Sequence, residues 1–160
     1  MGFWDSFNSS QFAYRNFSDQ IRNQRFSLSQ IDGVIRQLES WRKEFEGLRV
    51  PAGRERNSPA ALGRINEMVG RIGTRVNQML DLRTKLQRML QENQDRIQRL
   101  ELAIRKLDES LRRDRDKFLN LRSNGAKYGL NQQIREKEDL LKSMETQLTQ
   151  LRVKESSLSS

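Results

Sequence analysis

Residues 62–121 read LGRINEMVGRIGTRVNQMLDLRTKLQRMLQENQDRIQRLELAIRKLDESLRRDRDKFLNL, and this stretch decides the fold. When Leu62 is placed at heptad position a, fifteen of the eighteen a and d positions up to Leu121 are apolar. An unbroken 3.5-residue repeat of this length is typical of a left-handed coiled coil, and an amphipathic helix on a globular core rarely keeps such a register. The repeat therefore predicts one long central helix over about 59–122.

Three polar residues interrupt this predicted seam of a and d positions. Asn93 at a d position is expected to set the register or the oligomeric state at some cost in stability. Arg83 at an a position and Asp114 at a d position have two interpretations. They pair with charges on a facing helix, or they reach water near a gap in the pairing.

Two breaks divide the chain into three predicted helices. The two prolines, Pro51 and Pro59, flank a linker over 49–58, and Ser58 with Pro59 has the pattern of a helix N-terminus. The second break is a turn over 123–129, where Gly125 suits a left-handed C-cap. The prediction is an all-α, extended antiparallel coiled coil of three helices, in which helices 8–48 and 130–158 fold back along the central one. The corresponding regions are a docking segment (1–17), helix 1 (18–48), the linker (49–58), the basic heptad helix (59–122), the turn (123–129) and the C-terminal helix and tail (130–160).

Two apolar regions exceed what a pair of helices buries, so we expect them to contact protein subunits or a second copy. The apolar stripe widens in the middle of the central helix, and we predict a joining surface there. Its residues are Met79, Leu82, Leu86, Met89, Leu90 and Asn93. The N-terminal segment is rich in aromatic residues, which are favoured anchors of interfaces; those we assign to docking are Phe3, Trp4, Phe7 and Phe12. Packing of these aromatics against the chain's own helices, or contact with a membrane surface, are alternatives.

The net charge of +9 is concentrated in the central helix and its linker. Residues 51–122 carry 17 basic and 10 acidic side chains (+7), whereas 1–50 and 123–160 each carry +1. Basic residues fill six of the nine c positions, a pattern that suits a phosphate backbone or an acidic protein. Acidic residues one turn earlier predict i,i+4 ion pairs that compensate much of this ridge. The candidate anion-binding residues are Arg54, Arg56, Arg64, Arg105, Lys106, Arg112 and Arg113.

Catalytic chemistry finds no support in the sequence. The absence of Cys and His excludes thiolate nucleophiles, disulfides and imidazole ligands. Phosphate-binding glycine motifs are missing, and the carboxylates fall mainly on solvent-facing positions beside basic residues. We predict no enzyme activity, no catalytic residues, no cofactor and no metal site.

Targeting signals are equally sparse. No signal-peptide pattern and no run of apolar residues long enough for a transmembrane helix are visible, so we expect an intracellular location or one internal to an assembly. Met1-Gly2 followed by Ser6 formally fits a myristoylation pattern, which leaves acylation of Gly2 open.

The sequence thus favours a non-catalytic coiled-coil scaffolding protein that braces or joins components of a larger assembly, such as a virion, a secretion apparatus or a cytoskeletal structure. A basic helical protein that binds nucleic acid is the alternative. Peripheral association with a membrane is a less favoured one.

Overall fold

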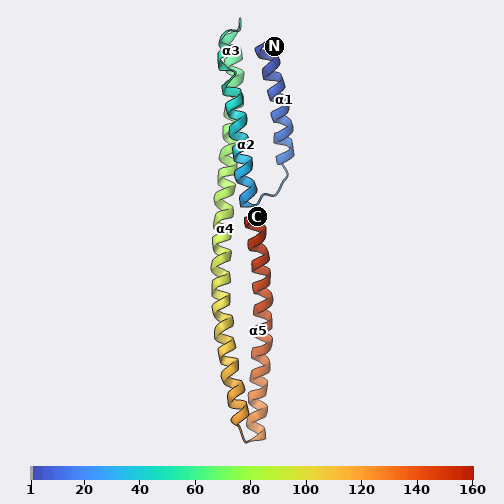
Figure 1. Cartoon of the computed structure of the whole chain (residues 1–160), viewed down its shortest axis with the longest axis vertical. Helices are drawn as coiled ribbons and strands as arrows, with labels where there is room; N and C mark the ends of the chain where they lie inside the picture. The colour runs from blue at the N-terminus through green and yellow to red at the C-terminus, as the bar shows by residue number, and fades with distance from the viewer. Residues whose placement is uncertain (1) are drawn as a thin grey trace. The chain divides into compact units, whose positions relative to one another are not determined.

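The computed structural model describes residues 2–160, which form helices and no strands (Figure 1). The helices are α1 (Phe3–Ile21), α2 (Leu28–Glu46), α3 (Arg49–Gly53), α4 (Ser58–Asn120) and α5 (Asn124–Ser159). The predicted all-α class is confirmed. The chain divides into two compact units, unit 1 up to Gln87 and unit 2 over Arg88–Ser159, and α4 contributes to both.

The predicted first helix over 8–48 is wrong, because the chain breaks between α1 and α2. The cause is a helix N-terminus at Ser27, whose backbone N–H donates to the Gln30 side-chain oxygen at 3.0 Å as half of a capping box. The segment 1–17, predicted as a separate docking segment, is the main part of α1.

The other two predicted breaks are shorter in the structure. The stretch 49–58 contains the short helix α3 rather than only a linker, and α4 is capped by Asn57, whose side-chain oxygen accepts from the Ala60 N–H at 3.3 Å. The predicted turn over 123–129 is mostly helical, because Ser123 caps α5 by accepting from the Ala126 N–H at 3.4 Å. Gly125 therefore lies inside a helix, and none of the described glycines has a positive φ.

In unit 1, α1 and α2 pack against each other and run antiparallel. Phe7 of α1 lies 5.7 Å from Phe45 of α2, between ring centroids. One turn further along α1, Ser10 Oγ donates to Glu44 Oε1 at 3.0 Å. The residue numbers increase on one helix as they decrease on the other, which defines an antiparallel pair.

Both helices also pack against the part of α4 that belongs to unit 1. Arg83 of α4 contacts Asp32 of α2 at 3.0 Å, whereas Arg49 contacts Asn66 at 2.9 Å, so α2 runs antiparallel to α4. Helix α1 runs parallel to α4, since Phe7 faces Arg64 and Gln11 faces Met68. Unit 1 is a three-helix bundle.

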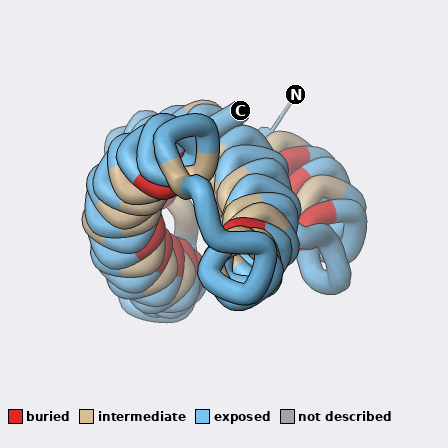
Figure 2. The backbone as a smooth tube through the Cα atoms, turned by 90° about the horizontal axis from the view of Figure 1, so that it is seen from below, coloured by how far each residue is buried: buried red, intermediate tan, exposed pale blue. Residues whose placement is uncertain are grey.

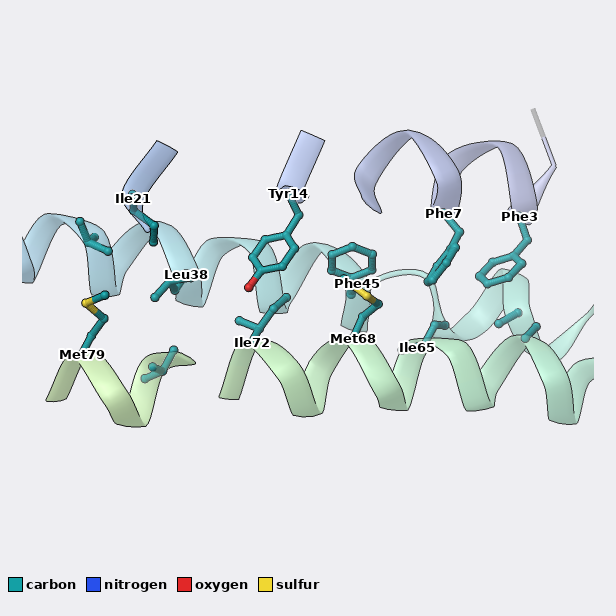
Figure 3. Close-up of a cluster of buried hydrophobic side chains, with 14 residues drawn as sticks. Phe3, Phe7, Tyr14, Ile21, Leu38, Phe45, Ile65, Met68, Ile72 and Met79 are labelled. Atoms are coloured by element: carbon teal, nitrogen blue, oxygen red, sulfur yellow. The ribbon is translucent and has the colours of Figure 1, made fainter. Parts of the chain in front are cut away.

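The core of unit 1 is formed by all three long helices (Figure 3). Helix α1 contributes buried residues at positions 3, 7, 10, 14 and 21, which follow a heptad-like spacing. On α4, the buried positions include g as well as a and d, because Ala61 and Met68 are buried beside Ile65 and Ile72. A third helix on the g side of α4 explains this wider buried face.

Unit 2 is an antiparallel hairpin of the remainder of α4 and α5. The Asn93 side chain donates to the Leu151 carbonyl at 2.8 Å, and at the other end Asp114 pairs with Lys137 at 2.5 Å. The heptad register of α4 continues through this unit, but only one helix faces it.

Candidate interaction surface

The apolar seam of unit 2 is incompletely covered. In unit 1 the d residues Ile65 and Ile72 are 0% exposed, whereas the d residues Leu100 and Leu107 in unit 2 are only half-buried. Buried residues occupy a single side of each helix (Figure 2). Since two helices cover each other's apolar stripe from one direction only, the flanks of the unit 2 seam stay open to solvent.

One flank of unit 2 carries polar bonds between its two helices, together with a groove of about 440 Å³ that has a mainly polar lining. On the side formed by e positions of α4, Gln94 donates to Glu155 at 3.2 Å and Glu101 pairs with Arg152 at 2.9 Å. Arg115, also at an e position, pairs with Glu138 at 3.1 Å. These contacts connect α4 to α5 along this flank.

The opposite flank, formed by g and c positions of α4, is hollowed into two grooves. The first has a volume of about 480 Å³ and an apolar floor. Its lining residues are Arg96, Arg99, Leu100, Ala103, Gln147, Gln150 and Leu151. The second groove, of about 640 Å³, lies beside the turn, between Lys117 of α4 and Gly129 of α5. We call this flank, with its two grooves, the g-side surface.

The α4 edge of the g-side surface is cationic. Between positions 96 and 120, the c and g positions of α4 hold five basic residues and no acidic one. They are Arg96, Arg99, Lys106, Arg113 and Lys117, all exposed, and within the described chain none of them has a carboxylate within 4.0 Å.

The predicted compensation of this basic ridge is largely wrong. Of the i,i+4 pairs expected from the sequence, Glu67 with Arg71 forms at 2.6 Å. The expected partners of Lys85, Arg99 and Arg113 do not pair with them in residues 2–160. Asp95, the expected partner of Arg99, instead accepts a hydrogen bond from Gln91 at 3.1 Å. More positive charge is therefore unpaired than the sequence suggested.

The predicted joining surface of α4 is mostly occupied by the chain itself. Met79 is buried in the unit 1 core and Leu82 packs against that core, because α1 and α2 cover this part of α4. Leu86 is also buried, and Met89 and Leu90 are half-buried. Asn93 is 1% exposed and hydrogen-bonded to Leu151. The expectation of a free apolar face is thus corrected for Met79, Leu82, Leu86 and Asn93.

The N-terminal aromatics divide into core and surface residues. Phe3 and Phe7 belong to the unit 1 core and are unavailable for docking, which corrects their assignment (Figure 3). Tyr14 packs 6.1 Å from Trp41, and burial raises its pKa above the ordinary value. Trp4 and Phe12 remain accessible, at 39% and 69% exposure. The alternative of packing against the chain's own helices is the one seen for Phe3 and Phe7.

The candidate anion-binding residues do not form one patch within either unit. Arg54 and Arg56 are exposed beside α3, whereas Arg64 lies over the Phe7 ring at 5.7 Å and 3.6 Å from Glu67. In unit 2, Arg105 and Arg112 occupy b positions, and Lys106 and Arg113 occupy c positions on the g-side surface; all four are exposed. Lys106 and Arg113 of the predicted set lie on the g-side surface, but none of the predicted residues lines a groove.

The polar residues of the α4 seam are paired across helices. Arg83 contacts Asp32 in unit 1, and Asp114 contacts Lys137 in unit 2, so the interpretation as cross-helix pairs is the one observed. Lys137 Nζ also donates to Ser110 Oγ at 2.7 Å. The Asn93 side-chain oxygen is buried without a hydrogen-bond partner.

Residues 2–160 lack the features of two other kinds of site. No group of three or more acidic, Cys or His residues is placed to hold a metal ion, and no helix has the length and apolarity needed to cross a membrane. No family model, curated protein sequence or solved structure matches this chain.

Sequence reasoning missed the groove residues Arg96, Arg99 and Ala103 on α4 and Gln147 and Gln150 on α5. The heptad register contained a signal for these α4 residues, since the c and g positions there hold basic side chains and the small side chain of Ala103. The opposite edge, contributed by α5, becomes visible only when the pairing of the two helices is known.

Proposed function

We propose that this protein is a non-catalytic coiled-coil scaffold that joins components of a larger assembly, such as a virion, a secretion apparatus or a cytoskeletal structure. The observation that carries the proposal is the contrast between the two units. Three helices bury the d residues Ile65 and Ile72 of unit 1 completely, whereas unit 2 leaves the d residues Leu100 and Leu107 half-buried beside its grooves. Exposed apolar surface of this kind marks sites where another protein binds, which supports a joining role for unit 2.

The coiled-coil description rests on the heptad register of α4. Its d positions Ile65, Ile72, Met79 and Leu86 are buried, and in unit 2 the seam continues through Ile97 and Leu111. The cross-helix bonds of Asn93 and Asp114 occupy d positions of the same register. Side chains at a and d that face a neighbouring helix over successive heptads are the geometry of a coiled coil.

A specific observation favours nucleic-acid binding as a second candidate. The unpaired cations of the g-side surface lie near Arg105 and Arg112 at exposed b positions, with Glu109 and Asp116 at the f positions between them, so unit 2 has many exposed basic residues on α4. Phosphate contacts by Lys and Arg are the main source of affinity in such proteins, and they weaken steeply with salt. Membrane association has less support, because Phe3 and Phe7 are in the core and only Trp4 and Phe12 of the predicted anchors are accessible.

The native mass of the purified chain, measured by light scattering before and after nuclease treatment, separates the first two candidates. For a scaffold we expect a mass that nuclease does not change and an absorbance spectrum of protein alone. Co-purified nucleic acid, with a mass that falls after nuclease, would contradict the scaffold and support the alternative.

A vesicle assay addresses the third candidate. Deleting residues 1–17 is unsuitable because it removes core residues, so we choose the double variant Trp4→Gln/Phe12→Gln, which changes only accessible aromatics. We expect neither the wild type nor the variant to sediment with anionic vesicles. Sedimentation of the wild type that the variant loses would identify a membrane protein instead.

A further inference from the structure

We infer that the g-side surface of unit 2 binds an acidic amphipathic helix of a partner protein, which completes a three-helix bundle there. This inference rests on the proposed scaffolding function and names the chemistry of the partner. Four observations carry it: the repeat of the grooves, their polarity, their charge, and the way α1 covers the same edge of α4 in unit 1.

The two grooves are the same structural feature repeated along the hairpin. Arg96, Arg99 and Leu100 line the first groove, and the residues 21 positions later, at the end of α4 and directly after it, line the second. On α5 the lining residues 147, 150 and 151 correspond in the same way to 126, 129 and 130. Twenty-one residues are three heptads, or about 32 Å of helix. A single straight helix of at least this length occupies both grooves.

The floor of the first groove selects a helix over other ligands. Leu100, Ala103 and Leu151 form an apolar floor, and Ala103 leaves room for a large side chain from the occupant. Apolar side chains of an amphipathic helix, spaced by three and four residues, fill such a groove. A nucleic-acid backbone gains nothing from an apolar floor, since its phosphates need cations or hydrogen-bond donors.

The two edges of the surface differ in charge, which defines the charge of the occupant. The α4 edge carries the five unpaired cations described above, and Asp116 is the one acidic residue of α4 that lines a groove. The α5 edge consists of the groove-lining positions 126, 129, 133, 147 and 150 and of the positions one heptad away from them. Over 126–150 this edge is nearly uncharged, and Glu136 is its one acidic residue. An occupant with acidic residues along the side that faces α4 complements this arrangement.

A second copy of this chain lacks that complementarity. Residues 123–160, which include α5, carry 6 basic and 5 acidic side chains, and 51–122 carry 17 and 10. The acidic residues of α4 in unit 2 gather at its e and f positions, where Glu101 already pairs with Arg152 of α5, and the apolar seam of the same helix already packs on α5. A second copy therefore offers no free helix that combines an apolar stripe with an acidic edge. The charge pattern points to a different protein.

Unit 1 shows the kind of element that covers this edge of α4. Helix α1 packs on the c and g positions there, with Phe7 under Arg64 and Gln11 against Met68. Its buried residues have the heptad-like spacing noted above, and Asp5 and Asp19 outnumber its single Arg15. Unit 2 has no α1-like helix among the described residues, and its equivalent edge is open.

The test measures the binding of a fluorescent 28-residue peptide to the full chain by anisotropy at physiological salt. The peptide has four heptads, with Leu at a and d and Glu at e and g, so that repulsion between glutamates prevents it from pairing with itself. A scrambled peptide of the same composition lacks the heptads. A DNA duplex and anionic vesicles serve as probes for the other occupants.

Three protein variants locate the site. Arg96→Gln/Arg99→Gln removes two groove cations, and we expect affinity for the heptad peptide to fall about tenfold, as for two exposed charge pairs. Ala103→Phe fills the groove, and we expect a loss of at least about tenfold. Arg105→Gln/Arg112→Gln is the matched control, since it removes two exposed cations from the other side of α4, and we expect a change of less than about twofold.

Binding of the heptad peptide at least tenfold tighter than the scrambled one, with this order of variants, supports the inference. Equal loss in both double-arginine variants, an unchanged affinity in Ala103→Phe, or equal binding of the scrambled peptide, the duplex or the vesicles would overturn it. If the peptide fails while light scattering shows a nuclease-resistant oligomer, a second copy occupies the surface, and the scaffold proposal survives. If the chain carries nucleic acid, both proposals fail.

Discussion

Truncation of Phe7 tests whether the N-terminal aromatics are core residues. Phe7 is 0% exposed, and its ring centroid lies within 6.0 Å of those of Phe3, Trp4 and Phe45. Phe→Ala substitutions in closed cores cost about 3 to 5 kcal/mol, from lost transfer free energy and the cavity that remains. We expect Phe7→Ala to lower the free energy of unfolding of unit 1 by this amount.

Urea denaturation followed by tryptophan fluorescence measures the effect. Both tryptophans, Trp4 and Trp41, lie in unit 1, so their emission reports on that unit. With a denaturant slope of about 2 kcal/mol per M, the midpoint of Phe7→Ala falls by about 2 M. If this variant does not fold, Phe7→Leu gives a smaller and measurable loss, of about 1 kcal/mol.

The matched control is Phe12→Ala, which changes the same residue type on the same helix at 69% exposure. Its expected effect is within about 0.5 kcal/mol. Equal midpoints for the Phe7 and Phe12 variants would refute the placement of Phe7 in the core and restore the N-terminal segment as a free docking element.

Three further predictions concern buried polar groups. Asn93→Leu removes a buried oxygen that has no partner, and we expect thermal unfolding of unit 2, followed by circular dichroism, to shift upward, by about 1 kcal/mol in stability; a lower melting temperature would contradict this. Lys137→Met leaves the Asp114 carboxylate, whose side chain is 11% exposed, without its cation, so we expect the stability of unit 2 to fall by about 2 kcal/mol or more. The double variant Lys137→Met/Asp114→Leu should recover this stability in the same assay. A double variant as unstable as the single one would count against the pairing. Burial raises the pKa of Tyr14, so the folded state favours the neutral phenol. The contribution of Tyr14 to the free energy of unfolding is therefore complete below pH about 10 and is lost as the pH rises through the raised pKa. Stability should fall less steeply with alkaline pH in Tyr14→Phe than in the wild type, and identical profiles would exclude this effect.

The sequence was informative about what each helix buries and less so about where helices end. The heptads of α4 predicted a long helix whose bounds differ by one or two residues from Ser58–Asn120. The break before α2 was missed although Ser27 and Gln30 form a capping-box pattern, because apolar residues on both sides continue a helical spacing. Similarly, the spacing of Phe3, Phe7 and Tyr14 is a heptad signal for α1 that the polar residues between them obscured.

The candidate site depended on tertiary information. The cross-helix partners of Arg83 and Asp114 lie on other helices, so two interpretations were equally consistent with the sequence. Ion pairs within α4 were overestimated because i,i+4 spacing permits a pair but gives only a few tenths of a kcal/mol for fixing two long side chains. The open edge of unit 2 was not predictable from α4 alone, since the pairing with α5 determines which flank carries polar bonds between the helices and which carries the apolar grooves.

The open seam of unit 2 is tested most directly by hydrogen exchange of the full chain, with and without the acidic heptad peptide. We predict that peptides from 124–159 exchange at least about tenfold faster than peptides from 28–46, because a two-helix hairpin protects its amides less than a closed three-helix core. Saturating heptad peptide should slow exchange over 124–159 and leave 28–46 unchanged. Equal protection of the two segments in the free chain, with no change on addition of the peptide, would contradict an open surface that receives a third helix.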